Sequence, residues 1–315
     1  MVKSITLEAP ATEVSFDEAA YLRANPDVAR AVPLAFPRGE AHFQLHGRYE
    51  KRFLRYDTSL ELLRRRKLDR LLPFMRQDLQ HVRRGQKFDF LTEALRAETG
   101  IIDTTAVSGL GYDAIVGQMI ETLEGGLLLD CGAGKRPIYY ENVVNYEIAD
   151  YDTTDVLGVG ECLPFIEGTF DAVISIAVLE HVRDPFRCAS EIIRVLKPGG
   201  RLMCCVPFLQ PYHGYPHHYF NMTHQGLRSL FERDLVITDQ LVLESIHPVA
   251  SLSWILQSWV SGLDESTREQ FYSMTVRELA GDPQLLVNEN WARELPLDKQ
   301  LELASATFVI GHKPS

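Results

Sequence analysis

The amino-acid sequence predicts an α/β fold built on a mostly parallel sheet. Five short apolar segments lie between residues 127 and 206, and turns or a helical pattern separate them. Near-continuous apolar strands of this kind are typical of a sheet that is covered on both faces. The chain has 315 residues, of which 45% are hydrophobic and 24% charged, so it is long enough to bury a sizeable core. The fold class follows from these observations.

The predicted strands occupy the second half of the chain. A helix is expected over 185–196, between the fourth and fifth strands, and the 250–300 segment with all three tryptophans is expected to be inserted helices. We expect one domain over 123–315 that contains this insertion. Two further strands would bring the total to seven. The seven expected strands are Leu127–Asp130, Val143–Ile148, Asp155–Val159, Ala172–Ala177, Gly200–Val206, Leu235–Glu244 and Ala306–Gly311.

The first 122 residues read as helical. Asp17 is placed to cap a helix, Pro26 begins or breaks the next one, and Gly47 follows the last. Residues 1–55 resemble a small helical accessory module of the form "YLxxNPDVxxAV … HFxxHGxxExR", which implies no chemistry of its own. Residues 56–122 are expected to form a helical cap or linker, ending in a helix over 113–123.

Charge and cysteine content restrict the function. The net charge of −11 argues against general affinity for nucleic acid. Residues 51–87 nevertheless hold 12 basic and 4 acidic residues, which indicates either a solvated helix face or a surface for an anionic partner. The five cysteines show no CxxC spacing and are expected to be reduced thiols in the cytoplasm. No run of about 18 apolar residues predicts a membrane span.

The most informative stretch is "LLLDCGAGKRP" over residues 127–137. It predicts a strand that ends in Asp130, followed by a turn in which Gly132 and Gly134 let a ligand approach the backbone. In open α/β sheets ligands bind beyond the carboxyl ends of the strands. A dinucleotide-binding turn would carry a third glycine where this chain has Pro137, and Asp130 would repel phosphate. The turn therefore suits a ligand with a cationic amino group.

Further blocks follow in order along the chain. Glu147 lies at the end of the second predicted strand, where a carboxylate can accept both hydroxyls of a ribose. The "GVGECLPF" loop over 158–165 can bind the edge and face of an adenine. The blocks "FDAVISIAVLEHV" and "RVLKPGG" complete the set.

Together these blocks resemble class I S-adenosylmethionine-dependent methyltransferases that act on small molecules, over residues 125–235. The resemblance implies a Rossmann-like seven-stranded sheet, here with an N-terminal helical extension, and S-adenosylmethionine as the cofactor. It implies that Asp130 meets the amino group of the methionine, that Glu147 holds the ribose, and that Tyr112 lies in a segment folded over the cofactor. The remaining residues that it assigns to the cofactor site are Cys131, Gly132, Ala133, Gly134, Gly160, Glu161, Cys162, Ile176, Ala177 and His181.

One position departs from the family. Relatives commonly have an aspartate at the end of the third strand, which accepts from the adenine amino group, and Val159 stands there in this chain. Glu161 or a backbone carbonyl is expected to replace it. A cofactor-binding scaffold without transferase activity and, less strongly, a nicotinamide-dependent oxidoreductase stay open as alternatives.

The segment after the fifth strand is rich in histidine. The loop over 206–223 resembles the "PFxxxxHxxPxHYxNxT" segment of methyltransferases from polysaccharide gene clusters. We expect His213 to be a general base, with His217 and His218 as the next candidates, and an oxygen atom to be the methyl acceptor. The alternatives are hydrogen bonding within a rigid loop and a metal site, but no further ligand is evident at a suitable spacing, so no metal is expected.

The acceptor itself is predicted only by class. The resemblance implies a small-molecule or glycan-related acceptor. The basic stretch and the accessory module favour one that is anionic or linked to carbohydrate. The sequence does not predict an oligomeric state.

Overall fold

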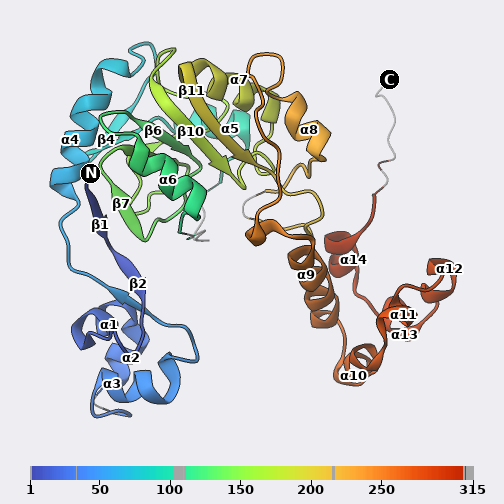
Figure 1. The fold of residues 1–315 in the computed structure, drawn as a ribbon. Helices are drawn as coiled ribbons and strands as arrows, with labels where there is room; N and C mark the ends of the chain where they lie inside the picture. The colour runs from blue at the N-terminus through green and yellow to red at the C-terminus, as the bar shows by residue number, and fades with distance from the viewer. Residues whose placement is uncertain are drawn as a thin grey trace. The chain divides into compact units, whose positions relative to one another are not determined.

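The computed structural model describes residues 2–32, 34–102, 109, 111–214, 217–307 and 309. The chain divides into two compact units, Met1–Cys205 and Val206–Ser315. The division falls at the end of the fifth predicted strand. Figure 1 shows the elements of both units, and each unit is described below by itself.

The first unit contains a seven-stranded sheet in the order β11-β10-β6-β8-β9-β5-β4. All neighbouring strands from β11 to β5 are parallel, and only β4 pairs antiparallel, so the predicted α/β class is confirmed. The strands are β4 (Val82–Arg84), β5 (Lys87–Asp89), β6 (Leu128–Cys131), β8 (Val143–Glu147), β9 (Val156–Leu157), β10 (Phe170–Ile176) and β11 (Leu196–Cys205).

The number of strands is as predicted, but two members of the sheet differ. No strand is present over 235–244, and the described residues of the 306–311 segment, 306, 307 and 309, are not in a strand either. The sixth and seventh strands of the sheet are instead β5 and β4, which lie at the edge opposite β11. They form a hairpin with a two-residue turn in which Gly85 has φ +59°, a conformation that glycine adopts readily. The sequence suggested that the 56–122 segment is helical throughout. The structure shows that it also contains this hairpin.

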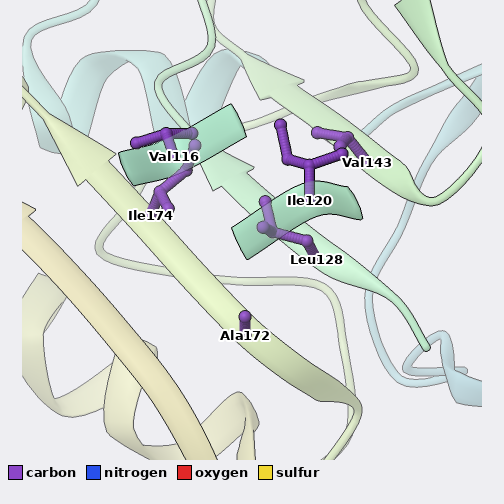
Figure 2. Packing of buried hydrophobic residues seen from close by; sticks show 6 residues of the cluster. All are labelled: Val116, Ile120, Leu128, Val143, Ala172 and Ile174. Carbon is purple, nitrogen blue, oxygen red and sulfur yellow. The ribbon is translucent and has the colours of Figure 1, made fainter. Parts of the chain in front are cut away.

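Helix α6 (Ala114–Thr122) covers one face of the central strands. Its Val116 and Ile120 are fully buried against residues of β6, β8 and β10 (Figure 2). Asp113 caps the helix by accepting a hydrogen bond from the backbone N–H of Val116, at 2.9 Å. On β10, Ala172 and Ile174 belong to this cluster, whereas Val173 points to the opposite face and is also fully buried. Both faces of the sheet are thus covered, as the apolar strands predict.

The N-terminal residues form a small module with its own core. The elements are β1 (Ser4–Thr6), β2 (Glu8–Pro10), α1 (Glu18–Ala24), α2 (Pro26–Ala31), α3 (Gly39–His42), the π-helical turn η1 (Phe43–Gly47) and β3 (Phe53–Arg55). Asp17 caps α1 as predicted, and the Tyr21 hydroxyl lies 2.9 Å from Nδ1 of the buried His42. The module is joined to the sheet-bearing part because β1 pairs with β7 (Ile138–Tyr140).

The basic stretch is partly internal. Helix α4 (Glu61–Leu71) buries Lys67 completely and Arg64 almost completely. Lys67 donates to Oδ2 of the buried Asp155 at 2.7 Å, and Arg64 donates to Oδ1 at 3.3 Å. Burial lowers the pKa of Lys67 to about 8, against the opposite effect of the Asp155 carboxylate. Two of the basic residues therefore fix the helix to the fold, while Arg65 and Arg66 remain exposed.

The remaining elements of the first unit are few. They are η2 (Leu72–Phe74), α5 (Glu93–Thr99) and α7 (Pro185–Val195), the last being the helix predicted over 185–196. Among the described residues no helix lies between β6 and β8, whose connection contains only the turn and β7. The site described below is built on that connection.

The second unit is helical. Its core consists of Val260, Leu263, Phe271, Trp291 and Leu295, which are all buried. The tryptophan-containing segment is thus helical, as predicted. Within the part of the chain that the structure describes, no helix has the length and apolar character needed to cross a membrane. The elements are α8 (His224–Ser229), η3 (Glu244–Ile246), α9 (Pro248–Ser261), α10 (Glu265–Ser273), α11 (Val276–Leu279), α12 (Pro283–Leu286), α13 (Asn290–Arg293) and α14 (Leu297–Leu303).

Candidate cofactor site

The predicted glycine turn follows β6, whose neighbours are β10 and β8. Gly132 and Gly134 have φ values of +86° and +61°, in the left-handed region that residues with a Cβ rarely adopt. A Cβ on Gly132 would lie 2.4 Å from Cγ2 of Val178, so the position has no room for a side chain. The N–H groups of Gly132 and Ala133 both donate to the carbonyl of Tyr146, at 2.9 and 3.0 Å. The turn is therefore tightly held against β8.

Asp130 is completely buried at the end of β6. Its Oδ2 accepts from the hydroxyl of Tyr112 at 2.6 Å and from Nε of Arg136 at 2.9 Å, and it forms an ion pair with a terminal nitrogen of Arg136 at 2.8 Å. Its Oδ1 is buried and accepts no hydrogen bond from any described residue. Burial and the adjacent Asp130 carboxylate raise the pKa of Tyr112 well above its ordinary value. The site thus holds a buried carboxyl group with one oxygen left for a ligand.

Glu147 ends β8, beside the turn. Its Oε2 accepts from the N–H of Gly134 at 2.6 Å, and its Oε1 accepts from the N–H groups of Ile148 at 2.7 Å and Ala149 at 3.3 Å. Burial raises the pKa of Glu147, and these backbone hydrogen bonds oppose that shift. The carboxylate is therefore fixed in place next to the glycine turn, and Glu147 lies at the end of its strand as predicted.

The loop after β9 is mostly apolar. Val159 is buried in a cluster with Leu91 and Leu157, against which Ile148 and Cys162 pack. Glu161 does not extend into solvent, because its Oε1 accepts from the backbone N–H groups of residues 183 and 184, at 3.1 and 3.5 Å. Gly160 is required by close packing, since a Cβ there would lie 2.4 Å from Sγ of Cys188. The segment after β9 is thus apolar and largely buried.

The end of β10 contains a strained residue. Ala177 has φ +56°, which is unusual for a residue with a Cβ, and its N–H donates to the carbonyl of Cys205 at 2.9 Å. Ile176 packs against the α6 cluster, and the backbone N–H of His181 closes a turn onto Val178. Strain of this type costs about 1–3 kcal/mol and is common at functional sites.

Two residues of this region were not among the predicted site residues. Arg136 lies in a loop, and a lone loop arginine is typically solvent-exposed, so its place in the sequence does not point to Asp130. Glu180 is fully buried, and burial raises its pKa to about 7. It adjoins the predicted His181, whose Nε2 lies 3.6 Å from Oε1 of Glu180. The "LEH" block could have pointed to Glu180, because an acid within an apolar run is unusual.

The histidine-rich loop belongs to the second unit and has a defined hydrogen-bond network. Nδ1 of His213 lies 2.8 Å from the carbonyl of Pro211, which can only accept, so this nitrogen carries a proton. Nδ1 of His218 accepts from the His213 N–H at 3.0 Å, and its Nε2 lies 2.8 Å from Oδ1 of Asn221. Burial lowers the pKa of His213. The ring of His217 lies 5.2 Å from that of Tyr219.

These contacts distinguish the three histidines. The neutral His213 ring has its basic lone pair on Nε2, which is the arrangement a general base needs. Both ring nitrogens of His218 take part in the loop network, which favours a structural role for that residue. This is the rigid-loop alternative that the sequence left open.

The chain is similar to known methyltransferases over part of its length. Residues 131–204 match a family model described as a methyltransferase domain. An uncharacterized methyltransferase of Mycobacterium sp. (strain JLS) is 39% identical over 66 residues, which are 21% of this chain and 25% of the relative. One from Mycolicibacterium vanbaalenii is 31% identical over 143 residues, or 39% of this chain and 53% of the relative. The chain thus spans about a quarter to a half of these relatives' lengths.

One solved structure is similar to part of the chain at low identity. The YcgJ protein of Bacillus subtilis aligns with 49% of this chain and 86% of its own, at 16% identity and a TM-score of 0.33. The matched family segment begins at Cys131 and ends one residue before the end of β11, so it includes the glycine turn and Glu147, while Tyr112 and Asp130 precede it. Residues 131–204 are therefore similar to a methyltransferase domain.

Proposed function

We propose that this protein transfers the methyl group of S-adenosylmethionine to an oxygen atom of a small-molecule or glycan-related acceptor. The observation that carries the proposal is the buried Asp130, whose Oδ1 lacks a hydrogen bond from the described residues, beside a glycine turn and the fixed Glu147. A buried acceptor without a donor is costly, and a ligand ammonium group would satisfy it.

The residues present fit the cofactor. Gly132 and Gly134 hold the turn beside Asp130 in left-handed backbone conformations, which a ligand with an amino-acid end would face. Glu147 would accept from the ribose hydroxyls, while the half-buried Cys162 would pack on the adenine ring. Tyr112, Cys131, Ala133, Ile176, Ala177 and His181 remain part of the proposed site, because they lie in or beside the same strand ends and turns.

The cofactor supplies an activated methyl group, so the protein has little acid–base chemistry to perform. Its residues would align the acceptor with the donor and exclude water, which contributes through proximity and orientation. For an oxygen acceptor we assign the general base to His213, since its Nδ1 hydrogen bond to Pro211 leaves the ring lone pair on Nε2. General base catalysis of this kind contributes about 10²–10⁴-fold to the rate.

The acceptor class and location belong to the same proposal. The exposed Arg65 and Arg66 of α4 support an anionic or carbohydrate-linked acceptor, and Arg64 and Lys67 do not contribute because they are used inside the fold. The five cysteines, all free in the structure, support a reducing compartment such as the cytoplasm.

Calorimetry with S-adenosylmethionine and S-adenosylhomocysteine tests the cofactor assignment, with the reduced nicotinamide dinucleotide as the contrasting ligand. Binding of the dinucleotide alone would contradict the proposal. Transfer of a labelled methyl group to a panel of sugar nucleotides, lipids and phenols then tests the activity. Binding without turnover across the panel would indicate a cofactor-binding scaffold instead of an enzyme.

The base is tested with two histidine variants. His213→Gln should lower turnover by about 10²–10⁴-fold while leaving the affinity for S-adenosylhomocysteine unchanged. His224→Gln is the matched control, because His224 is an exposed residue at the start of α8 and should retain full activity. Equal activity of the two variants would remove His213 from the mechanism.

A further inference from the structure

We propose that Arg136 binds the carboxylate of the cofactor's amino-acid end, next to the ammonium group on Asp130. The inference rests on the proposed cofactor, and it makes Arg136 a residue that determines which sulfonium nucleosides the site accepts. The ligand class is a nucleoside that carries a complete zwitterionic amino acid.

The first argument is that the two oxygens of Asp130 have different surroundings. Oδ2 accepts one hydrogen bond from Arg136 and one from Tyr112, and it also forms an ion pair with a terminal nitrogen of Arg136. Oδ1 is buried and has no such partner. A ligand ammonium group can therefore meet Oδ1 without displacing Arg136 from Oδ2. The Arg136 guanidinium contacts the other oxygen of the same carboxylate, so it is available to a carboxylate attached next to that ammonium group.

The second argument is charge. Asp130 is fully buried and only 8% of Arg136 is exposed, so the pair forms a nearly neutral unit in a region of low dielectric. An isolated buried carboxylate would favour any cation. A carboxylate paired with a guanidinium matches a ligand that carries one positive and one negative charge. Arginine suits the second contact because its planar group has five N–H donors and binds carboxylates through two of them.

The third argument is that Tyr112 fixes the guanidinium. The centre of the Arg136 guanidinium lies 4.2 Å from the centre of the Tyr112 ring, which is a cation–π distance. The hydroxyl of the same tyrosine donates to Asp130 Oδ2. The Tyr112 side chain thus contacts both charged groups and fixes their positions. Tyr112 is therefore a positioning residue for the Asp130–Arg136 pair.

The competing explanation is that Arg136 only neutralises a buried acid. The two explanations differ in the ligand they favour. Decarboxylated S-adenosylmethionine keeps the ammonium and sulfonium groups but lacks the carboxylate. A purely neutralising arginine gives no preference between it and S-adenosylmethionine, whereas a carboxylate-binding arginine favours the complete amino acid.

The experiment is calorimetry of both nucleosides with the full chain. The unaltered protein should bind S-adenosylmethionine about 10- to 100-fold more tightly than the decarboxylated form, as expected for one charged hydrogen-bonded contact. Arg136→Gln should remove this preference, and Arg136→Lys should keep part of it. Asp130→Asn should lower the affinity for both nucleosides to a similar extent, because both carry the ammonium group. Arg201→Gln, at an exposed arginine of β11, is the matched control and should change neither affinity.

A second variant keeps the test decisive if Arg136→Gln leaves Asp130 unpaired and fails to fold. The double variant Asp130→Asn/Arg136→Gln removes both charges and should bind the two nucleosides equally. Equal binding by the unaltered protein, or a preference retained in Arg136→Gln or in the double variant, would overturn the inference and leave the proposed function standing. No binding of either nucleoside by the unaltered protein would instead overturn the proposed function.

Discussion

The side-chain nitrogen of Lys67 lies 2.7 Å from Oδ2 of Asp155, and both side chains are completely buried. Asp155 also accepts from the backbone N–H of Asn145 at 3.0 Å and from the hydroxyl of Tyr139. One carboxylate before β9 therefore joins helix α4, β8 and β7. The contact explains why a basic helix packs tightly against a sheet instead of facing solvent.

Lys67→Met should destabilise the protein by about 3–5 kcal/mol, because removing one partner of a buried ion pair leaves the other with its burial uncompensated. Urea unfolding at neutral pH measures the change. Arg66→Met is the matched control on the same helix. It should stay within about 0.5 kcal/mol of the unaltered protein, since Arg66 is exposed. Similar midpoints for the two variants would show that the buried pair does not hold α4.

Gly132→Ala should be strongly destabilising and should abolish S-adenosylhomocysteine binding. It combines a left-handed φ of +86° with a Cβ only 2.4 Å from Val178. The backbone alone accounts for about 1–2 kcal/mol. Gly168→Ala isolates that part, because Gly168 has φ +62° and nothing lies within 4 Å of an added Cβ.

The overlap with Val178 can be tested separately. Adding Val178→Ala to Gly132→Ala should recover part of the stability, measured by urea unfolding, since the clash is with the valine side chain. A double variant no more stable than Gly132→Ala would mean that the backbone conformation is the whole cost.

Much of this site could be predicted because its chemistry is local in the sequence. Asp130, Gly132 and Glu147 stand at the ends of buried strands, and buried parallel strands are recognisable as apolar runs. The five central strands were predicted for the same reason. The carboxyl ends of neighbouring parallel strands meet at one edge of a sheet, so the two acids could be placed near each other from the sequence pattern alone.

The parts that could not be predicted depend on contacts between distant residues. β4 and β5 have three residues each and include charged ones, so no apolar run marks them. Lys67 and Asp155 are 88 residues apart, and nothing local distinguishes Lys67 from the exposed Arg66. Arg136 looks like a solvated loop residue until its partner Asp130 is located. In each case a contact with a residue distant in the sequence decides whether the segment forms a strand or the side chain is buried. Local sequence preference does not decide it.

Ala177→Gly should stabilise the protein slightly, by up to about 1 kcal/mol. The native φ of +56° is strained for alanine and relaxed for glycine, although the glycine raises the entropy of the unfolded chain. Ala172→Gly on the same strand is the control and should destabilise, because Ala172 is fully buried in a regular strand. Thermal unfolding followed by circular dichroism measures both. A destabilised Ala177→Gly variant would show that the alanine methyl contributes packing that outweighs its strain.

The stability of the protein should fall as the pH rises from about 4.5 to 8, through the titration of Glu180. Burial raises the pKa of Glu180 from 4.5 to about 7, so between these values the folded protein holds a proton that the unfolded chain has released. The folded state binds more protons there, and the free energy of unfolding therefore decreases with pH. A shift of this size corresponds to a fall of about 3 kcal/mol in the free energy of unfolding.

Glu180→Gln should remove this pH-dependent loss of stability, because the amide is neutral throughout. Glu167→Gln, at an exposed acid, should keep it. Urea unfolding of the three proteins at several pH values gives the comparison, and parallel pH profiles for the unaltered protein and Glu180→Gln would contradict the assignment.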